Sequence, residues 1–284
     1  MLDVVKQVRA AFSLLNPDHV RTLAMRPVSI GLVASSDRGY HELEEFLIPA
    51  SVPDGVRDQL RGTLHRAGDP RVPPKVDLVL YEPGLAHPEG TFSYRPDDPE
   101  STVKEILHAN DELALALARR YPVFRKAVVE RTIMAVAQEN ALFAVATALP
   151  NVVPSLFELP WAFGEFASDT VFLTLNQVRM ALLIAGACGS EVGFTQQKGE
   201  ILSIVAAAFG WRTIARELAG KIPLGGGLIP KGAIAFAGTF VVGKGLERLH
   251  HGNAPYNRRQ RQDVFQTAFE RGKVAVESIT RKVG

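Results

Sequence analysis

The chain changes character near residue 98, and this change limits the folds that it can adopt. Before that point, residues 27–34 and 76–81 are short apolar runs bounded by proline and polar residues, which is typical of buried strands. A polar turn at 35–39 and helical patterns at 40–47 and 53–64 separate these two runs. After residue 98 the sequence holds no strand pattern. We therefore predict an α/β N-terminal domain with a small parallel sheet, followed by an all-α helical bundle.

Capping residues and prolines set the expected boundaries of the helical part. Asp98 is suited to cap a helix that begins at Pro99 and runs to about Arg120. Later helices end before prolines or at the glycine-rich turn 222–230, and the last covers roughly 259–282. The expected organisation is an N-terminal helix at 1–26, the α/β domain at 27–97 and the helical domain at 98–284.

The apolar residues concentrate in the helical domain. The mean hydropathy of the chain is +0.06, and nearly all the excess apolarity lies in residues 140–243, which include the apolar core helices of 170–243. Residues 170–190 would reach about 31 Å as a helix, which is long enough to span a bilayer. However, Arg179 near the middle would cost roughly 2.5–3.5 kcal/mol on insertion, and glycines at 225–227 break the second apolar segment. These features favour a packed bundle, soluble or peripheral, with a membrane-inserted hairpin as the alternative.

Positive charge concentrates at the C-terminal end. The whole chain carries a formal charge of +2, whereas residues 244–284 hold nine Lys/Arg and four Asp/Glu, a balance of +5. Arg258, Arg259 and Arg261 form the densest part of this basic C-terminal helix. It is either a solvated helix start or a contact with anionic lipid, where each basic residue adds about 1 kcal/mol. The near-neutral chain as a whole argues against a nucleic-acid partner.

The turn after the first predicted strand has the position of a phosphate-binding loop. Such a loop needs glycines for close backbone approach, a lysine for the phosphates and a hydroxyl for magnesium. Here only the second glycine, Gly39, is present, and Tyr40 and His41 replace the lysine and the hydroxyl. The residues left to contact a phosphate are Ser35, Ser36 and Gly39. We interpret the turn as a structural remnant, with weak nucleotide binding as the alternative.

Other motifs of nucleotide chemistry and catalysis are missing. Tyr81 stands where the second strand should lead to a magnesium-binding aspartate, and no Asn-Lys-x-Asp motif occurs. The histidines lack metal-ligand spacing, and the single cysteine, Cys188, excludes an internal disulfide or a multi-cysteine metal site. We therefore predict no catalytic residues, no metal and no cofactor, which argues against an enzyme. GTP or another nucleotide remains the alternative ligand.

A polar group interrupts the apolar segment 170–190. It consists of Asn176, Gln177 and Arg179. Polar side chains on an otherwise apolar helix usually hydrogen-bond to neighbouring helices, so we predict a structural polar network. The expected partner of Arg179 is Glu165, Asp169 or Glu217.

Three motifs occur in order along the helical region: Thr174–Met180, Phe209–Leu218 and Ala235–Gly243. With them, residues 169–252 resemble a bacterial family, a domain of unknown function often found C-terminal to Era-like GTPase domains. The resemblance implies a helical, membrane-associated or membrane-proximal module. The preceding α/β domain resembles a shortened, degenerate GTPase domain, a pseudo-GTPase, in its strand–turn–helix order.

These features lead to one expected function and two alternatives. We expect a non-catalytic, membrane-associated adaptor or scaffold built on a GTPase-derived fold, cytoplasmic and on the inner face of the cell membrane. Its expected partners are an anionic membrane surface or a membrane protein, and a second copy of the chain. The alternatives are an atypical nucleotide-binding hydrolase that uses the 34–41 turn, and a soluble, oligomerising helical protein that binds a partner.

Overall fold

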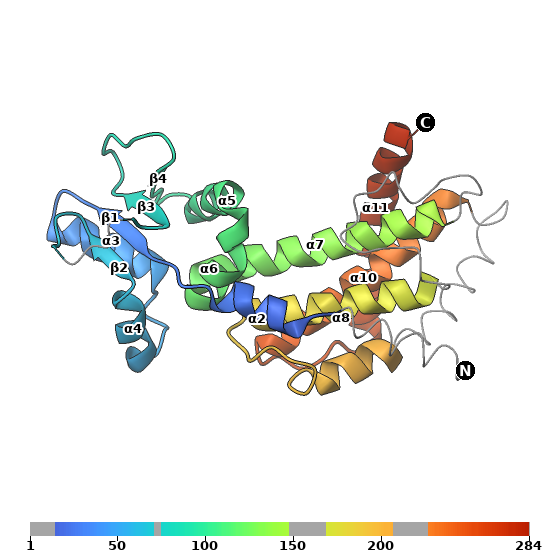
Figure 1. Ribbon diagram of the computed structural model, residues 1–284. Coiled ribbons are helices and arrows are strands. Elements are labelled where there is room, and N and C mark those ends of the chain that lie inside the picture. Colours follow the sequence, from blue (N-terminus) through green and yellow to red (C-terminus); the bar gives the residue numbers. More distant parts are fainter. Residues whose placement is uncertain (1–14, 71–74, 148–168, 207–226, 284) are drawn as a thin grey trace. The chain divides into compact units, whose positions relative to one another are not determined.

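The chain consists of two compact units (Figure 1). The computed structural model describes residues 15–70, 75–147, 169–206 and 227–283. The sheet unit comprises His19–Glu130 and Gly186–Glu191, and the bundle unit comprises Arg131–Ala185 and Val192–Gly284 together with the first 18 residues. An α/β part is thus followed by a helical part, as the sequence predicts.

The sheet unit contains one four-stranded parallel sheet. Its strands are β1 (Ile30–Val33), β2 (Leu64–Arg66), β3 (Leu78–Tyr81) and β4 (Phe92–Ser93), in the order β2-β1-β3-β4. In register, Ile30 of β1 pairs with Leu64 on one side and with Leu78 on the other. Ile30 and Leu32 of β1 and Leu78 and Leu80 of β3 are buried, whereas Val33 and Val79 are half-buried.

The sheet unit also contains several short helices, the first of which, α2 (Pro17–Met25), enters the unit at His19. Ser36 caps α3 by accepting a hydrogen bond from the Gly39 amide, and Asp98 caps α5 by accepting one from the Ser101 amide, as predicted for Asp98. The helices are α2 (Pro17–Met25), α3 (Asp37–Leu47), α4 (Asp54–Arg61), α5 (Pro99–Ala109), the 3₁₀ turn η1 (Asp111–Leu113), α6 (Ala114–Arg120) and the start of α7 (Pro122–Ala146).

Two predicted helices end earlier than expected. The pattern at 53–64 predicts one helix, but α4 ends at Arg61 and the following residues form the edge strand β2. The helix predicted from Pro99 to Arg120 is interrupted at Asn110, whose backbone N and side-chain Nδ2 both donate to the Ile106 carbonyl, at 3.0 and 2.9 Å. An asparagine side chain that competes for a helical carbonyl favours a helix end.

Boundaries at the N-terminal side also differ from the prediction. Helix α2 begins only at Pro17, and residues 1–14 of the predicted helix 1–26 lie outside the described part of the chain. The predicted domain boundary at residue 98 falls inside the sheet unit, which continues to Glu130. The helices after residue 98 are therefore divided between the two units.

The bundle unit is built from long helices. It contains α7 from Arg131 onward, α8 (Asp169–Ala187) up to Ala185, a helical stretch at 198–206, α10 (Leu228–His250) and α11 (Arg258–Val283). Helices α10 and α11, orange and red in Figure 1, pack side by side. The core joins α7, α10 and α11 through Ala137, Ala141, Val145, Phe236, Ala237, Val241, Phe265, Ala268 and Val276.

Glycines allow the bundle helices to approach closely. A Cβ on Gly243 of α10 would lie 2.7 Å from Ile133 Cγ1 of α7 and 3.1 Å from Met180 Sδ of α8. A Cβ on Gly272 of α11 would lie 3.1 Å from the Ala233 backbone of α10. Small residues at helical spacing therefore act here as contact points between helices.

One described helix meets the length and composition criteria for a membrane span. Within α8, Thr170–Ala187 has a mean hydropathy of 1.4 over 18 residues, but 78% of this window is buried inside the protein. Protein side chains therefore cover most of the apolar surface of α8.

Candidate functional site

The predicted phosphate turn lies at the switch point of the sheet. The chain leaves β1 toward β2 on one side, whereas it leaves β3 toward β4 on the other. In open parallel sheets, ligands bind outside the carboxyl ends of strands whose connections diverge in this way. Ser35 and Ser36 follow β1 after Ala34, and Glu82 directly follows β3. The fold thus places these residues where a ligand would be expected.

The turn after β1 presents hydrogen-bond donors, but a side chain of the protein itself occupies them. The Ser35 amide donates to Glu82 Oε2 at 2.6 Å, and the Ser35 hydroxyl donates to the same oxygen at 2.7 Å. The Ser36 hydroxyl oxygen accepts from the Gly39 amide at 3.1 Å and so caps α3. An amide and a hydroxyl at a helix start are the groups that bind phosphate in related turns. Here they bind a carboxylate.

Gly39 leaves the space that this carboxylate fills. A Cβ at Gly39 would lie 2.4 Å from Glu82 Oε1 and 2.8 Å from Oε2, which is too close for any side chain. Gly39 is therefore required for the approach of Glu82. The predicted residues Ser35, Ser36 and Gly39 do come together in the structure, around Glu82.

The electrostatics of the turn favour the bound carboxylate in its charged form. The hydrogen bond from the Ser35 amide, followed by that from the Ser35 hydroxyl, lowers the pKa of Glu82 below its ordinary 4.5. The nearby Arg66 at the end of β2 is held by other acids: it lies 2.9 Å from Glu44 and 3.4 Å from Asp37. Negative charge already satisfies both the donors and this cation.

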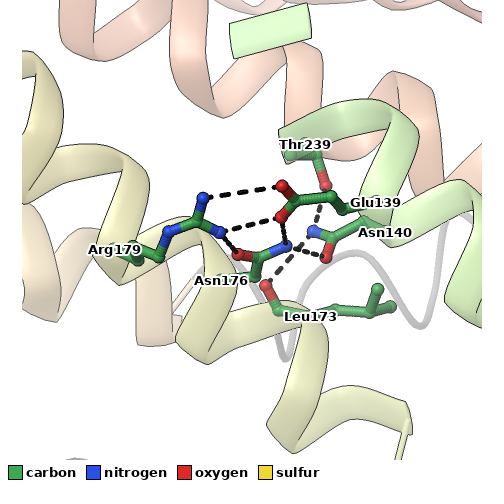
Figure 2. Close-up of polar contacts among 6 residues, drawn as sticks. All are labelled: Glu139, Asn140, Leu173, Asn176, Arg179 and Thr239. Atoms are coloured by element: carbon green, nitrogen blue, oxygen red, sulfur yellow. Dashed lines mark hydrogen bonds and ion pairs between the residues drawn. The ribbon is translucent and has the colours of Figure 1, made fainter. Parts of the chain in front are cut away.

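A second polar cluster lies inside the bundle unit (Figure 2). Asn140 of α7 donates to Thr239 Oγ1 of α10 at 2.8 Å and accepts from Asn176 Nδ2 of α8 at 3.0 Å. Gln177 donates to the same Thr239 oxygen at 3.2 Å. Asn140 and Thr239 are 0% and 1% exposed, so these bonds form in the core. The cluster links three helices.

Arg179 lies at the edge of this polar cluster. Its Nη1 lies 2.8 Å from Glu139 Oε2 and 2.7 Å from Asn176 Oδ1. Glu139 also accepts from Asn176 Nδ2 at 2.9 Å. The side chains of Arg179 and Glu139 are about one-fifth exposed. This geometry neutralises Arg179 and satisfies the amide of Asn176.

The structure gives Arg179 a partner that the sequence analysis did not name. We expected Glu165, Asp169 or Glu217, but Glu165, Glu217 and the side chain of Asp169 lie outside the described residues. Glu139, the partner in the structure, lies 40 positions earlier on α7. Only the packing of α7 against α8 brings the two residues together, and the sequence alone gives no register for that packing.

Outside these two places, the described residues include few groups that could bind a ligand or a metal. A pocket of about 120 Å³ between α3 and α4 is lined by both acidic and basic side chains, among them Glu44, Glu45, Arg57 and Arg61. Arg57 contributes to the fold, because its Nη2 donates to the carbonyls of Ala50 and Val52. Among the described residues, no three His, Cys, Asp or Glu side chains gather as a metal site would require.

Another buried group has a structural role. Tyr121 is fully buried, and its hydroxyl lies 2.7 Å from Thr63 Oγ1. Burial raises the pKa of Tyr121 to about 12, so the phenol stays neutral and serves as a hydrogen-bonding core residue.

Comparisons with known proteins give no information on the family or function of this chain. No family model, curated protein or solved structure matches this chain. The resemblance to the bacterial helical family remains a prediction, and its middle motif, 209–218, lies outside the described residues.

Proposed function

We propose that this protein is a non-catalytic adaptor, built on a shortened GTPase-derived α/β fold, that associates with an anionic membrane surface on the cytoplasmic side. The main support for a non-catalytic role is that Ser35 binds the Glu82 carboxylate at the switch point of the sheet. A nucleotide would have to displace this carboxylate before its phosphate could reach the same donors.

Charge and composition make that exchange unfavourable. A displaced Glu82 would still lie near the turn and would repel a phosphate, because like charges close together raise each other's energy. Tyr40 stands where a phosphate-binding lysine would be, so no lysine at that position compensates. Glu82 thus acts as an internal substitute for a phosphate and fixes the turn in one arrangement.

Two features of the bundle unit support peripheral association rather than insertion. The apolar window of α8 is mostly buried, so lipid is not needed to cover it. Glu139 pairs with Arg179, so that charge is satisfied by protein. Exposed arginines at the start of α11 then provide charge for a negatively charged surface.

Titration of the purified chain with labelled GTP and ATP tests the non-catalytic part. We expect no saturable binding and no phosphate release at millimolar nucleotide with magnesium present. Saturable binding that excess unlabelled nucleotide displaces would overturn this part and would favour the hydrolase alternative.

Fractionation of the chain expressed in a bacterial host tests the membrane part. We expect it to sediment with membranes, to be released by high salt and to be fully released by carbonate. Retention after carbonate would indicate insertion and contradict a peripheral protein. Complete recovery in the soluble fraction, as a defined oligomer by light scattering, would overturn membrane association and favour the soluble partner-binding alternative.

A further inference from the structure

An exposed, basic corner joins the last two helices of the bundle unit. We define the arginine corner as the exposed residues Leu249, His251, Arg258, Arg259 and Arg261, from the end of α10, the connection and the first turns of α11. Residues 248–262 contain four arginines and no Asp or Glu, a balance of +4. This is a larger local excess of positive charge than the +2 of the whole chain.

The side chains of the three arginines in the first turns of α11 form no hydrogen bond or ion pair with other described residues. Within the described part of the chain, no carboxylate pairs with Arg258, Arg259 or Arg261, and all three are exposed. Elsewhere, exposed arginines such as Arg38 and Arg95 pair with acids at 3.0 and 2.7 Å. The arginine corner therefore presents uncompensated charge to an external partner.

Other residues hold the arginine corner in shape. Asn257 Oδ1 accepts from the Gln260 amide at 2.9 Å, and Gln260 Oε1 accepts from the Asn257 amide at 3.0 Å. This reciprocal capping fixes the first turn of α11. Arg248 donates from Nε to the Ala254 carbonyl and lies 4.9 Å over the Tyr256 ring, which fixes the connection. A preorganised surface loses less entropy on binding than a mobile one.

We propose that the arginine corner is the surface through which the bundle unit binds the phosphate headgroups of an anionic bilayer. This inference rests on the membrane association proposed above and assigns it to particular residues. Guanidinium groups bind phosphate oxygens through two parallel hydrogen bonds. Leu249 is 45% exposed beside Arg248, so an aliphatic side chain can enter the boundary between headgroups and acyl chains. That apolar contact favours lipid over nucleic acid as the partner.

Sedimentation of the full chain with lipid vesicles tests the arginine corner. Wild-type protein should bind vesicles that contain phosphatidylglycerol, should not bind pure phosphatidylcholine and should release as salt rises. Each basic residue near such a surface strengthens binding about fivefold, so the variant R258Q/R259Q/R261Q should bind roughly a hundredfold more weakly. Leu249→Ser should weaken binding roughly tenfold through lost apolar contact.

A matched variant removes the same charge elsewhere. The control R38Q/K75Q/K104Q lowers the net charge by the same three units through exposed residues of the sheet unit, and it should bind nearly as well as the wild type. Far-UV circular dichroism should show equal helical content in all variants.

The outcomes separate this inference from the proposed function. If the wild type binds anionic vesicles and the R258Q/R259Q/R261Q variant binds equally well, the assignment of lipid binding to the arginine corner is wrong, while membrane association stands. If the wild type does not bind vesicles at all, both fail. If the triple substitution abolishes binding to duplex DNA or RNA but leaves vesicle binding unchanged, the surface recognises nucleic acid and the lipid assignment is overturned.

Discussion

Replacing Asn140 by leucine should destabilise the bundle unit. Asn140 is 0% exposed and makes two well-placed bonds, to Thr239 Oγ1 at 2.8 Å and from Asn176 Nδ2 at 3.0 Å. A third contact, to the Leu173 carbonyl at 3.4 Å, is at the edge of hydrogen-bonding distance (Figure 2). Leucine fills a similar volume but cannot form any of the three.

The size of the effect follows from what each partner retains. Each lost bond contributes about 1 kcal/mol net, and a buried group left without a partner costs about 1–3 kcal/mol. Thr239 keeps Gln177 and Asn176 keeps Glu139, so neither loses every partner. We therefore expect the free energy of unfolding to fall by about 2–3 kcal/mol and the melting temperature to fall by roughly 5–10 °C.

Urea unfolding followed by far-UV circular dichroism measures this change. The control Gln177→Leu removes a single bond of 3.2 Å and should cost about 1 kcal/mol. The double variant Asn140→Leu/Thr239→Val should lose less unfolding free energy than the two single variants lose together, because the bond between the two residues is counted in both single losses. An Asn140→Leu variant as stable as the wild type would refute the structural role of the polar cluster.

Two further predictions concern the helix contacts and the carboxylate at the turn. Gly243→Ala should lower the free energy of unfolding by about 1–3 kcal/mol, because its Cβ would lie 2.7 Å from Ile133. Gly245→Ala, whose Cβ would meet nothing within 4 Å, should instead stabilise α10 by up to about 1 kcal/mol. Equal effects of the two substitutions in urea unfolding would contradict the close packing at Gly243. Because Ser35 lowers the pKa of Glu82, the stabilisation from this contact should be complete above pH 4.5 and should disappear as pH falls through the lowered pKa. Glu82→Gln should remove this part of the pH dependence, and unchanged acid unfolding in that variant would show that the carboxylate is not bound in the turn.

Local patterns predicted much of the fold because those elements depend on nearby residues. The continuous apolar runs before Ser35 and Glu82 formed the two central strands, and Asp98 and Pro99 began a helix as expected. The edge strand β2 was missed because Leu64–Arg66 is short and mostly polar. Its place in the sheet comes from pairing with β1, which is not visible in its own sequence.

Contacts between distant residues could not be predicted in the same way. The sequence singled out Ser35, Ser36 and Gly39, but its patterns alone did not place Glu82, 47 positions after Ser35, in the turn. A carboxylate directly after the second strand was the available clue. The strand order, which places the ends of β1 and β3 side by side, was needed to interpret it.

The amide resonance of Ser35, observed by nitrogen-15 NMR of serine-labelled protein and assigned with Ser35→Ala, shows whether Glu82 or a nucleotide phosphate binds in the turn. This amide donates to Glu82 at 2.6 Å, in the place where a phosphate would bind. We expect this resonance to titrate with Glu82 below pH 4.5 and not to move when about 5 mM GTP and magnesium are added at neutral pH. A saturable shift with nucleotide, together with no response to acid, would show that the turn is an open phosphate site and would contradict the account.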